Sequence, residues 1–213
     1  MKVKAIIFDM DGVITNTMPD HYKAWNAVFA QEGFHLSHLE VYSREGQPGN
    51  ISVKEFFATK KIPFEQDKAR WILQNKERLF ERIVRRRFIP GSRRFLRSLR
   101  RKGFQLALVT GTSRHEVHRI LPEHIFGLFS VIITGSDVKK GKPHPEPFLK
   151  ALQKLKCGSH EAVVIENAPF GIQSAKSAGL RCLALETSLP KRYLKKADAV
   201  FASIKELQKK VKF

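Results

Sequence analysis

The sequence has few cysteines and no long apolar segment. Cys157 and Cys182 are the only cysteines among 213 residues, too few for a disulfide framework, and their spacing does not suggest a zinc site. The hydrophobic runs have the length of single strands, so none could span a bilayer. We therefore expect two free thiols, a cytoplasmic location and no association with a membrane.

Acidic residues are also scarce. The 20 Asp and Glu residues stand against 39 Lys and Arg residues, which gives a formal net charge of +19. The positive charge is concentrated between Glu81 and Lys102 and between Lys191 and Phe213. Such a surface attracts polyanions and steers anionic substrates. Because no aromatic residues are interleaved to stack on bases, we favour solvated helix faces over a nucleic-acid or other polyanion partner.

Within this basic chain, one strand-sized apolar run ends at two aspartates. Residues 4–8 read Lys-Ala-Ile-Ile-Phe, and Asp9 and Asp11 follow. Open α/β sheets bind ligands at the carboxyl ends of strands, and Gly12 allows a sharp turn that brings Asp11 back toward Asp9. One aspartate can act as a covalent nucleophile in phosphoryl transfer while a second serves as acid and base. The pair predicts phosphate chemistry that needs cations from elsewhere.

Candidate phosphate-binding groups follow a second apolar run. Residues 104–109 form a strand-like stretch that ends at Thr110 and Gly111. A hydroxyl and an unobstructed backbone amide suit phosphate oxygens. Further along, Lys142 lies in a loop flanked by prolines, just before a helical stretch. This lysine would supply a fixed cation.

Candidate metal ligands follow a third apolar run. Residues 162–165 read Ala-Val-Val-Ile and end at Glu166 and Asn167. Side-chain oxygens of this type are the ligands that a hard cation such as Mg²⁺ prefers. The three runs together predict one crevice that holds a phosphate group and a magnesium ion.

The organisation of the chain follows from the order of these runs. Strand-sized apolar runs alternate with helical periods, which predicts a parallel sheet covered by helices. The segment between the first aspartates and Pro90 has no strand signal and predicts an all-helical insert. We expect an α/β core of residues 1–16 and 89–213 and an inserted helical domain of residues 17–88.

Helix boundaries are indicated by capping boxes and by apolar spacing. A helical pattern runs from Glu65 to Arg87. The pattern of a serine with a glutamate three residues later predicts helix starts at Ser37, Ser52, Ser113 and Ser203.

The motifs, in this order, resemble those of the haloacid dehalogenase superfamily, in the group of β-phosphoglucomutases and small-molecule phosphatases. The resemblance covers nearly the whole chain and implies a Rossmann-like sheet with a helical cap that closes over the active site. It implies that Asp9 is the nucleophile that forms an aspartyl-phosphate and that Asp11 is the general acid and base. It further implies that Thr110, Gly111 and Lys142 bind the phosphoryl group.

The resemblance also implies a Mg²⁺ cofactor. Its ligands would be the Asp9 carboxylate, the Asp11 backbone carbonyl and the end of the third strand at Glu166 and Asn167. The family commonly has Glu-Asp at this last position, whereas this chain has Glu166-Asn167. An amide oxygen coordinates a hard cation without adding negative charge. We therefore expect weaker Mg²⁺ binding or a larger share carried by Glu166.

Three residues at the start of the predicted cap are candidates for substrate contacts. Thr17, His21 and Trp25 are similar to the β-phosphoglucomutase pattern, in which the polar members contact the sugar or help to position the acid and base. The structural alternative places Trp25 in the core of the cap and leaves His21 partly exposed on its helix. The first interpretation predicts a substrate of phosphosugar size.

Mutase activity needs an anchor for a second phosphate. The loop 44–50 has no cation just after Gly46, where mutases present an arginine, although Arg44 could substitute from the other side. Hydrolysis is therefore favoured over isomerisation. We predict a Mg²⁺-dependent phosphatase that hydrolyses a small phosphorylated metabolite through an aspartyl-phosphate. A sugar-phosphate mutase with the same intermediate and a non-catalytic polyanion-binding protein are the alternatives.

Overall fold

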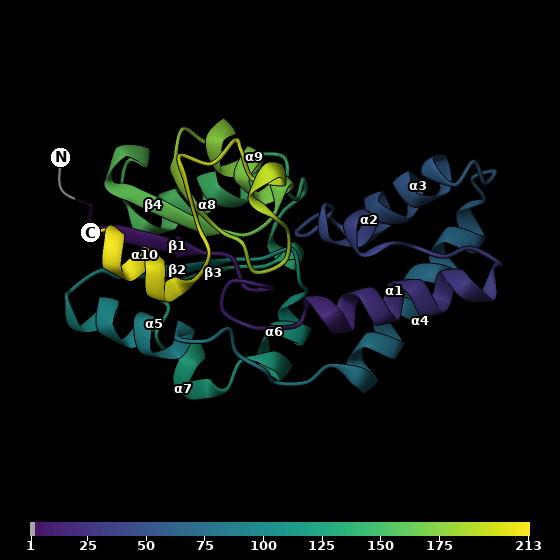
Figure 1. Ribbon diagram of the computed structural model, residues 1–213, viewed down its shortest axis with the longest axis horizontal. Coiled ribbons are helices and arrows are strands. Elements are labelled where there is room, and N and C mark those ends of the chain that lie inside the picture. The colour runs from purple at the N-terminus through teal and green to yellow at the C-terminus, as the bar shows by residue number, and fades with distance from the viewer. Residues whose placement is uncertain (1–2) are drawn as a thin grey trace.

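The computed structural model describes residues 3–213, and its centre is a parallel sheet of six strands within that range (Figure 1). The order across the sheet is β3-β2-β1-β4-β5-β6, so the first strand of the chain lies in the middle. This topology confirms the predicted α/β class with a Rossmann-like sheet. The strands are β1 (Ala5–Phe8), β2 (Gln105–Val109), β3 (Val131–Ile133), β4 (Ala162–Glu166), β5 (Arg181–Leu185) and β6 (Ala199–Phe201).

Helices cover both faces of the sheet, which is why the central strands are apolar on both sides. Ile6 and Phe8 of β1 share an apolar cluster with α5, α6, α7 and α10, whereas Ile7 shares a second cluster with α8 and α9. Alternation along β1 therefore separates two layers of the core. The outer elements are α5 (Ser92–Arg101), α6 (Arg114–Ile120), α7 (Glu123–Phe126), α8 (Glu146–Leu155), α9 (Pro169–Ser177) and α10 (Ile204–Lys210), with short 3₁₀ turns η1 (Gly135–Asp137), η2 (Ser159–Glu161) and η3 (Lys191–Tyr193).

Between β1 and α5, all of which is described, the chain folds into helices that extend away from the sheet at the right of Figure 1. They bury an apolar cluster of their own. At its centre the ring of Phe29 lies edge-on to the rings of Phe56 and Phe57, with centroids 5.4 and 6.2 Å away. The insert thus has a hydrophobic core separate from the two layers around the sheet. Its helices are α1 (Met18–Gln31), α2 (His38–Tyr42), α3 (Gly49–Thr59) and α4 (Gln66–Ile83).

Three of the four predicted helix starts are confirmed. Ser37 and Ser113 form reciprocal capping boxes at α2 and α6, and Ser203 caps α10 by accepting a hydrogen bond from a backbone N–H. The prediction for Ser52 is wrong, because this residue lies inside α3. Its hydroxyl donates to the side-chain oxygen of Gln47 at 2.9 Å, and α3 begins after Pro48 instead.

The predicted end of the long helix is also wrong, since α4 stops at Ile83 and not at Arg87. The residues after Ile83 leave the helix and form hydrogen bonds with Asp20 of α1 instead. The backbone nitrogen of Arg85 and the guanidinium of Arg87 donate to the Asp20 carboxylate at 3.2 and 2.7 Å. No helix in residues 3–213 combines the length and the apolar content of a membrane span.

Candidate active site

The residues predicted for catalysis meet at the carboxyl edge of the sheet. β1 lies between β2 and β4, so Asp9 after β1, Thr110 after β2 and Glu166 at the end of β4 are neighbours. Their side chains are at most 3% exposed. The backbone nitrogen of Asp9 still donates to the carbonyl oxygen of Ile165 at 3.0 Å, which extends the ladder by one residue. The sheet itself therefore fixes the place of the predicted nucleophile.

Lys142 reaches the same edge from the loop before α8 and connects two of the acids. Its Nζ atom donates to Asp9 Oδ1 at 2.6 Å, to Glu166 Oε1 at 2.7 Å and to the carbonyl oxygen of Val109 at 3.1 Å. The lysine is 1% exposed. A desolvated ammonium group depends on such partners, so this contact set holds Lys142 in one position.

Negative charge exceeds positive charge in this cluster. Burial raises the pKa of Asp9 to about 8, against the opposing effect of Lys142, and the Glu166 and Asp11 charges raise it further. Burial alone would lower the pKa of Lys142, but the Asp9 and Glu166 carboxylates raise it. Three buried carboxyl groups thus face one ammonium group in the described part of the chain. A second cation would relieve this excess.

Asp11 is turned toward the helical insert by the chain reversal at Gly12, whose φ is +86° as the sequence predicts. The Thr17 hydroxyl donates to Asp11 Oδ1, and the Thr112 hydroxyl donates to Asp11 Oδ2 at 2.7 Å. His21 Nε2 lies 3.6 Å from Oδ1. Burial alone would raise the pKa of Asp11, but the contacts with His21, Thr17 and Thr112 outweigh it and lower the pKa. These contacts fix the orientation of the predicted acid and base.

The predicted phosphate-binding turn lies directly under a loop of the insert. Thr110 Oγ1 donates to Asp11 Oδ2 at 3.5 Å and accepts a hydrogen bond from the backbone nitrogen of Thr112 at 3.1 Å. A Cβ atom on Gly111 would lie 2.7 Å from the carbonyl oxygen of Gly46, and one on Gly46 would lie 2.6 Å from the side chain of Lys142. Glycines at 46 and 111 therefore permit the insert to close onto the sheet edge.

Two oxygens of the predicted metal site have no hydrogen-bond partner among residues 3–213. They are Asp9 Oδ2 and Asn167 Oδ1, and both are buried. A buried acceptor without a partner is costly; Mg²⁺ would satisfy Asn167 Oδ1 with the ligand type it prefers, and an incoming group would satisfy Asp9 Oδ2. Glu166 differs, because Oε1 accepts from Lys142 and Oε2 accepts from the backbone nitrogens of Asn167 and Ala168 at 2.7 and 3.0 Å.

The donor set at this edge is of mixed chemistry. No group of three or more His, Cys, Asp or Glu side chains in the described chain is arranged to hold a metal ion. The predicted set depends instead on an amide oxygen from Asn167 and on a main-chain carbonyl from Asp11. Asn167 is held by its Nδ2 atom, which donates to Ser188 Oγ at 2.9 Å, so the amide oxygen remains free. These residues fit a single hard cation.

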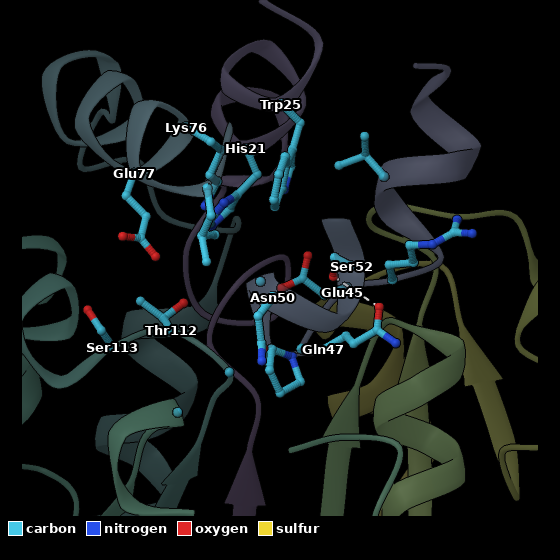
Figure 2. Close-up of a pocket in the computed structure, with 18 of the residues that line it drawn as sticks. His21, Trp25, Glu45, Gln47, Asn50, Ser52, Lys76, Glu77, Thr112 and Ser113 are labelled. Atoms are coloured by element: carbon cyan, nitrogen blue, oxygen red, sulfur yellow. Dashed lines mark hydrogen bonds between the residues drawn. The ribbon is translucent and has the colours of Figure 1, made fainter. Parts of the chain in front are cut away.

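A cavity of about 340 Å³ lies between the sheet edge and the insert. Figure 2 shows Thr112 and Ser113 on its sheet side, and His21, Trp25 and Lys76 projecting from the helices on the opposite side. Asp9, Asp11 and Lys142 lie under the loop that contains Gly46 and do not line the cavity themselves. The described conformation therefore has its insert closed over the predicted reacting groups.

The three predicted cap residues have different environments. His21 and Trp25 line the cavity, whereas Thr17 is fully buried and is bound to Asp11. His21 stacks on Phe80 with ring centroids 3.9 Å apart. Trp25 is 7% exposed and belongs to the apolar core of the insert. The structural interpretation of Trp25 is therefore correct, and the same ring also forms part of the cavity wall.

Lys76 lines the cavity and was not predicted. It is 8% exposed, and its Nζ atom lies 4.8 Å from the ring centroid of Phe80 and 5.3 Å from that of Trp25. Burial lowers the pKa of Lys76, although nearby glutamates oppose the effect. Ile72, Lys76 and Phe80 follow one another at intervals of four along α4, and all three are buried. The sequence feature that could have identified Lys76 is its position in the helical repeat, where an amphipathic helix places apolar residues.

The loop after α2 brings an acid, Glu45, to the cavity beside Arg44. Glu45 is partly buried, and burial together with the Asp11 charge raises its pKa well above the usual value. The guanidinium of Arg44 is engaged elsewhere: Nε donates to Glu55 at 3.1 Å and Nη1 donates to the carbonyl oxygen of Glu40 at 2.8 Å. Arg44 also lines the cavity, so its role as an anchor for a second phosphate stays a prediction, one that these contacts within the insert disfavour.

Comparison with known proteins places this site in a family. Residues 6–185 match the family model described as haloacid dehalogenase-like hydrolase. The chain belongs to the haloacid dehalogenase-like hydrolase family. The resemblance predicted from the four motifs is thereby confirmed, and the match runs from within β1 to the end of β5 and includes the whole insert.

Several named members of this hydrolase family are similar over most of their length. The phosphorylated carbohydrates phosphatase of Thermotoga maritima is 33% identical over 185 residues, which cover 84% of this chain and 82% of that protein. The beta-phosphoglucomutase of Bacillus subtilis is 28% identical over 88% of this chain and 85% of its own. The crystal structure of CbbY from Rhodobacter sphaeroides in complex with phosphate superimposes with a TM-score of 0.80 at 26% identity, and the match covers 96% of each chain.

Proposed function

We propose that this hydrolase is a Mg²⁺-dependent phosphatase of small phosphorylated metabolites that works in the cytoplasm through a phosphorylated Asp9. The observation that carries the proposal is the hydrogen bonding of the Asp9 carboxylate. One oxygen is held by Lys142 at 2.6 Å, and the other, Oδ2, has no partner in residues 3–213. A carboxylate that is fixed on one side and free on the other can attack in one direction.

In the proposed reaction, Asp9 Oδ2 forms a bond to phosphorus while the bond from phosphorus to the leaving oxygen breaks. Asp11, whose protonation the negative charge of a bound phosphate would favour, gives a proton to that leaving oxygen. In the second half, Asp11 takes a proton from the water that attacks phosphorus, the bond to Asp9 breaks and inorganic phosphate leaves. Lys142, the Thr110 hydroxyl and the Gly111 amide would bind the phosphoryl oxygens. The hydrogen bonds from Thr17 and Thr112 keep Asp11 pointing toward the insert, where the leaving group would lie.

Asp9, the Asp11 carbonyl, Asn167 and Glu166 would hold the magnesium ion. When bound, Mg²⁺ would neutralise part of the negative charge that three carboxyl groups and a phosphate bring together. Glu166 also has a second task in this proposal, because its Oε1 atom fixes Lys142 at 2.7 Å.

The helices of residues 17–88 would act as the cap that admits and selects the substrate, with His21 and Trp25 as contact residues and Thr17 as a positioning residue for Asp11. The cavity of about 340 Å³ is large enough for a phosphosugar and is lined by both charged and aromatic groups. The activity named for the Thermotoga maritima relative, a phosphatase of phosphorylated carbohydrates, supports the same substrate class.

The test is phosphate release from a panel of sugar phosphates and other phosphomonoesters, with Mg²⁺ and with a chelator. We expect turnover of at least one phosphosugar that is lost on chelation and lost in Asp9→Asn. Asn keeps the shape of the side chain and cannot form the acyl phosphate, so its thermal unfolding profile should remain cooperative. Undiminished turnover by Asp9→Asn would rule out the nucleophile.

A mutase is the second candidate, because the Bacillus subtilis relative is named beta-phosphoglucomutase and Lys76 offers a cation on the far side of the cavity. Conversion of a hexose 1-phosphate into the 6-phosphate, only when primed with the bisphosphate, would establish it. Against this candidate, the guanidinium of Arg44 is engaged within the insert, and Glu45 beside it in the cavity wall supplies no cation.

A further inference from the structure

A second concave site lies away from the catalytic edge, on the outer side of α5. The sequence of this helix is Ser-Arg-Arg-Phe-Leu-Arg-Ser-Leu-Arg-Arg. Its apolar residues, Phe95, Leu96 and Leu99, are buried against the sheet, while every arginine is exposed. Amphipathic packing therefore explains the buried face of α5 but not the exposed one. The exposed face of α5 carries five arginines and no acidic residue.

The arginines form one wall of a groove of about 1160 Å³. The other wall comes from α10, which packs in the same apolar layer as α5 and lies on the same side of the sheet in Figure 1. Lys205 and Gln208 project from α10 into this groove, and no Asp or Glu of the described chain lines it. No residue lines both this groove and the cavity at the sheet edge. The two sites are therefore physically separate.

The charge of the groove is not neutralised within the molecule. None of the arginines from Arg93 to Arg101 forms an ion pair with a described acid, whereas other exposed basic residues do, as Lys68 with Glu32 and Lys210 with Glu206 show. Two arginines are held in place by neutral groups. The Arg93 guanidinium lies 4.9 Å from the Phe88 ring centroid, and Arg100 donates to the carbonyl oxygen of Phe104 at 3.3 Å. A polyanion would relieve the repulsion among these like charges.

The positions of the arginines suit a linear polyanion. Counted from Arg93, the other four arginines follow after one, four, seven and eight residues. This spacing places all five along one side of α5 over about 12 Å, enough for several consecutive phosphates of one strand. Guanidinium groups bind phosphate oxygens through two parallel hydrogen bonds. Phe88, Ile89 and Leu128 also line the groove, but they are buried or half-buried. The exposed large apolar side chains that could anchor a protein or membrane partner lie elsewhere, at Leu39, Ile51, Phe64, Trp71 and Leu149.

We propose that the groove between α5 and α10 binds the phosphate backbone of single-stranded nucleic acid without reading its bases. Phe88 is the one aromatic residue among the described lining residues, and Arg93 already covers it, so base stacking contributes little. Recognition through phosphates alone predicts an affinity that depends on salt and not on sequence. This site is independent of the phosphatase activity proposed above.

The test is fluorescence anisotropy of the full chain with labelled oligo(dT) and oligo(dA) across a salt series. With about four phosphates contacted, we expect both strands to bind equally and to lose about 50-fold in affinity between 50 and 200 mM salt. The triple variant Arg94→Gln, Arg97→Gln, Arg101→Gln removes exposed arginines that make no described contact. It should lose at least about tenfold in affinity, and its salt slope should fall by about 2.

The matched control removes the same charge elsewhere through Arg78→Gln, Arg82→Gln and Arg181→Gln, and should bind oligo(dT) within about twofold of the parent. Phosphate release by the groove variant should be unchanged, which separates this proposal from the proposed catalytic function. Three outcomes would overturn the proposal: no binding of oligo(dT) at 50 mM salt, equal losses in the two triple variants, or equally tight binding of a polyglutamate peptide or of anionic lipid vesicles that is lost in the groove variant.

Discussion

The buried lysines of the sheet edge and of the helical insert have different contacts. At the sheet edge, Lys142 is bound by two carboxylates and a carbonyl oxygen, so its charge is fixed before any substrate arrives. In the insert, the ammonium group of Lys76 faces two aromatic rings and no carboxylate within hydrogen-bond reach in the described chain. The first arrangement is preorganised for a constant group such as phosphate. The second keeps a desolvated charge available for the variable part of a substrate.

The comparison predicts its largest effect at Lys142. In Lys142→Met, Asp9 and Glu166 would remain buried without their cation, which costs about 3–5 kcal/mol of unfolding free energy. Loss of a fixed donor to the phosphoryl group should lower kcat by at least about 10²-fold. Chemical denaturation and phosphate release measure the two effects. Lys154→Met on the exposed side of α8 is the matched control, and a Lys142→Met protein that keeps parental kcat would refute the preorganised sheet edge.

Lys76→Met should act on binding instead of chemistry. Removal of a charged hydrogen-bond donor costs about 1.5–3 kcal/mol of substrate binding, so KM for a phosphosugar should rise about 10- to 100-fold while kcat changes little. For phenyl phosphate, which has no group to reach Lys76, KM should not change. Arg78→Met, two residues further along α4 and exposed, is the control. A fall in kcat with unchanged KM would contradict the assignment of Lys76 to the variable part of the substrate.

Asn167→Asp tests the metal side of the sheet edge. The variant would place an anionic oxygen where Asn167 Oδ1 now lies without a partner, and Ser188 could still bind the other oxygen. We expect the Mg²⁺ concentration for half-maximal activity to fall several-fold, because one more negative ligand strengthens a hard-cation site. An unchanged Mg²⁺ dependence, measured by titration of the activity, would show that residue 167 is not a ligand.

The sheet edge could be predicted from the sequence and much of the insert could not, for a physical reason. Asp9, Thr110 and Glu166 each follow an apolar strand, and parallel strands put such positions together whatever the details of packing. Lys76 lies in the cavity wall because α4 packs against α1, and the sequence around it resembles an ordinary amphipathic helix. The three-residue strand β6 was not predicted, and its apolar run is too short to show a periodicity.

The smallest expected effect lies just outside the sheet edge, at Asp137 in η1. Burial would raise the pKa of Asp137, but hydrogen bonds from Arg114 and Thr134 outweigh it and lower the pKa to about 2. A carboxyl group whose pKa is lower in the folded state than in the unfolded state stabilises the fold above its unfolded pKa of about 3.9, and this contribution is lost as the pH falls toward 2.

Asp137→Asn should therefore lower the unfolding temperature at neutral pH and have little effect at a pH near 2. The loss at neutral pH should correspond to about 1 kcal/mol or less, since Arg114 is 44% exposed and its ion pair is screened by water. Circular dichroism melts of parent and variant across this pH range measure the difference. If the two proteins differed equally at neutral and acidic pH, the Asp137 charge would not be the cause, and the support of η1 for the cavity wall at Ser136 would depend on its neutral hydrogen bonds alone.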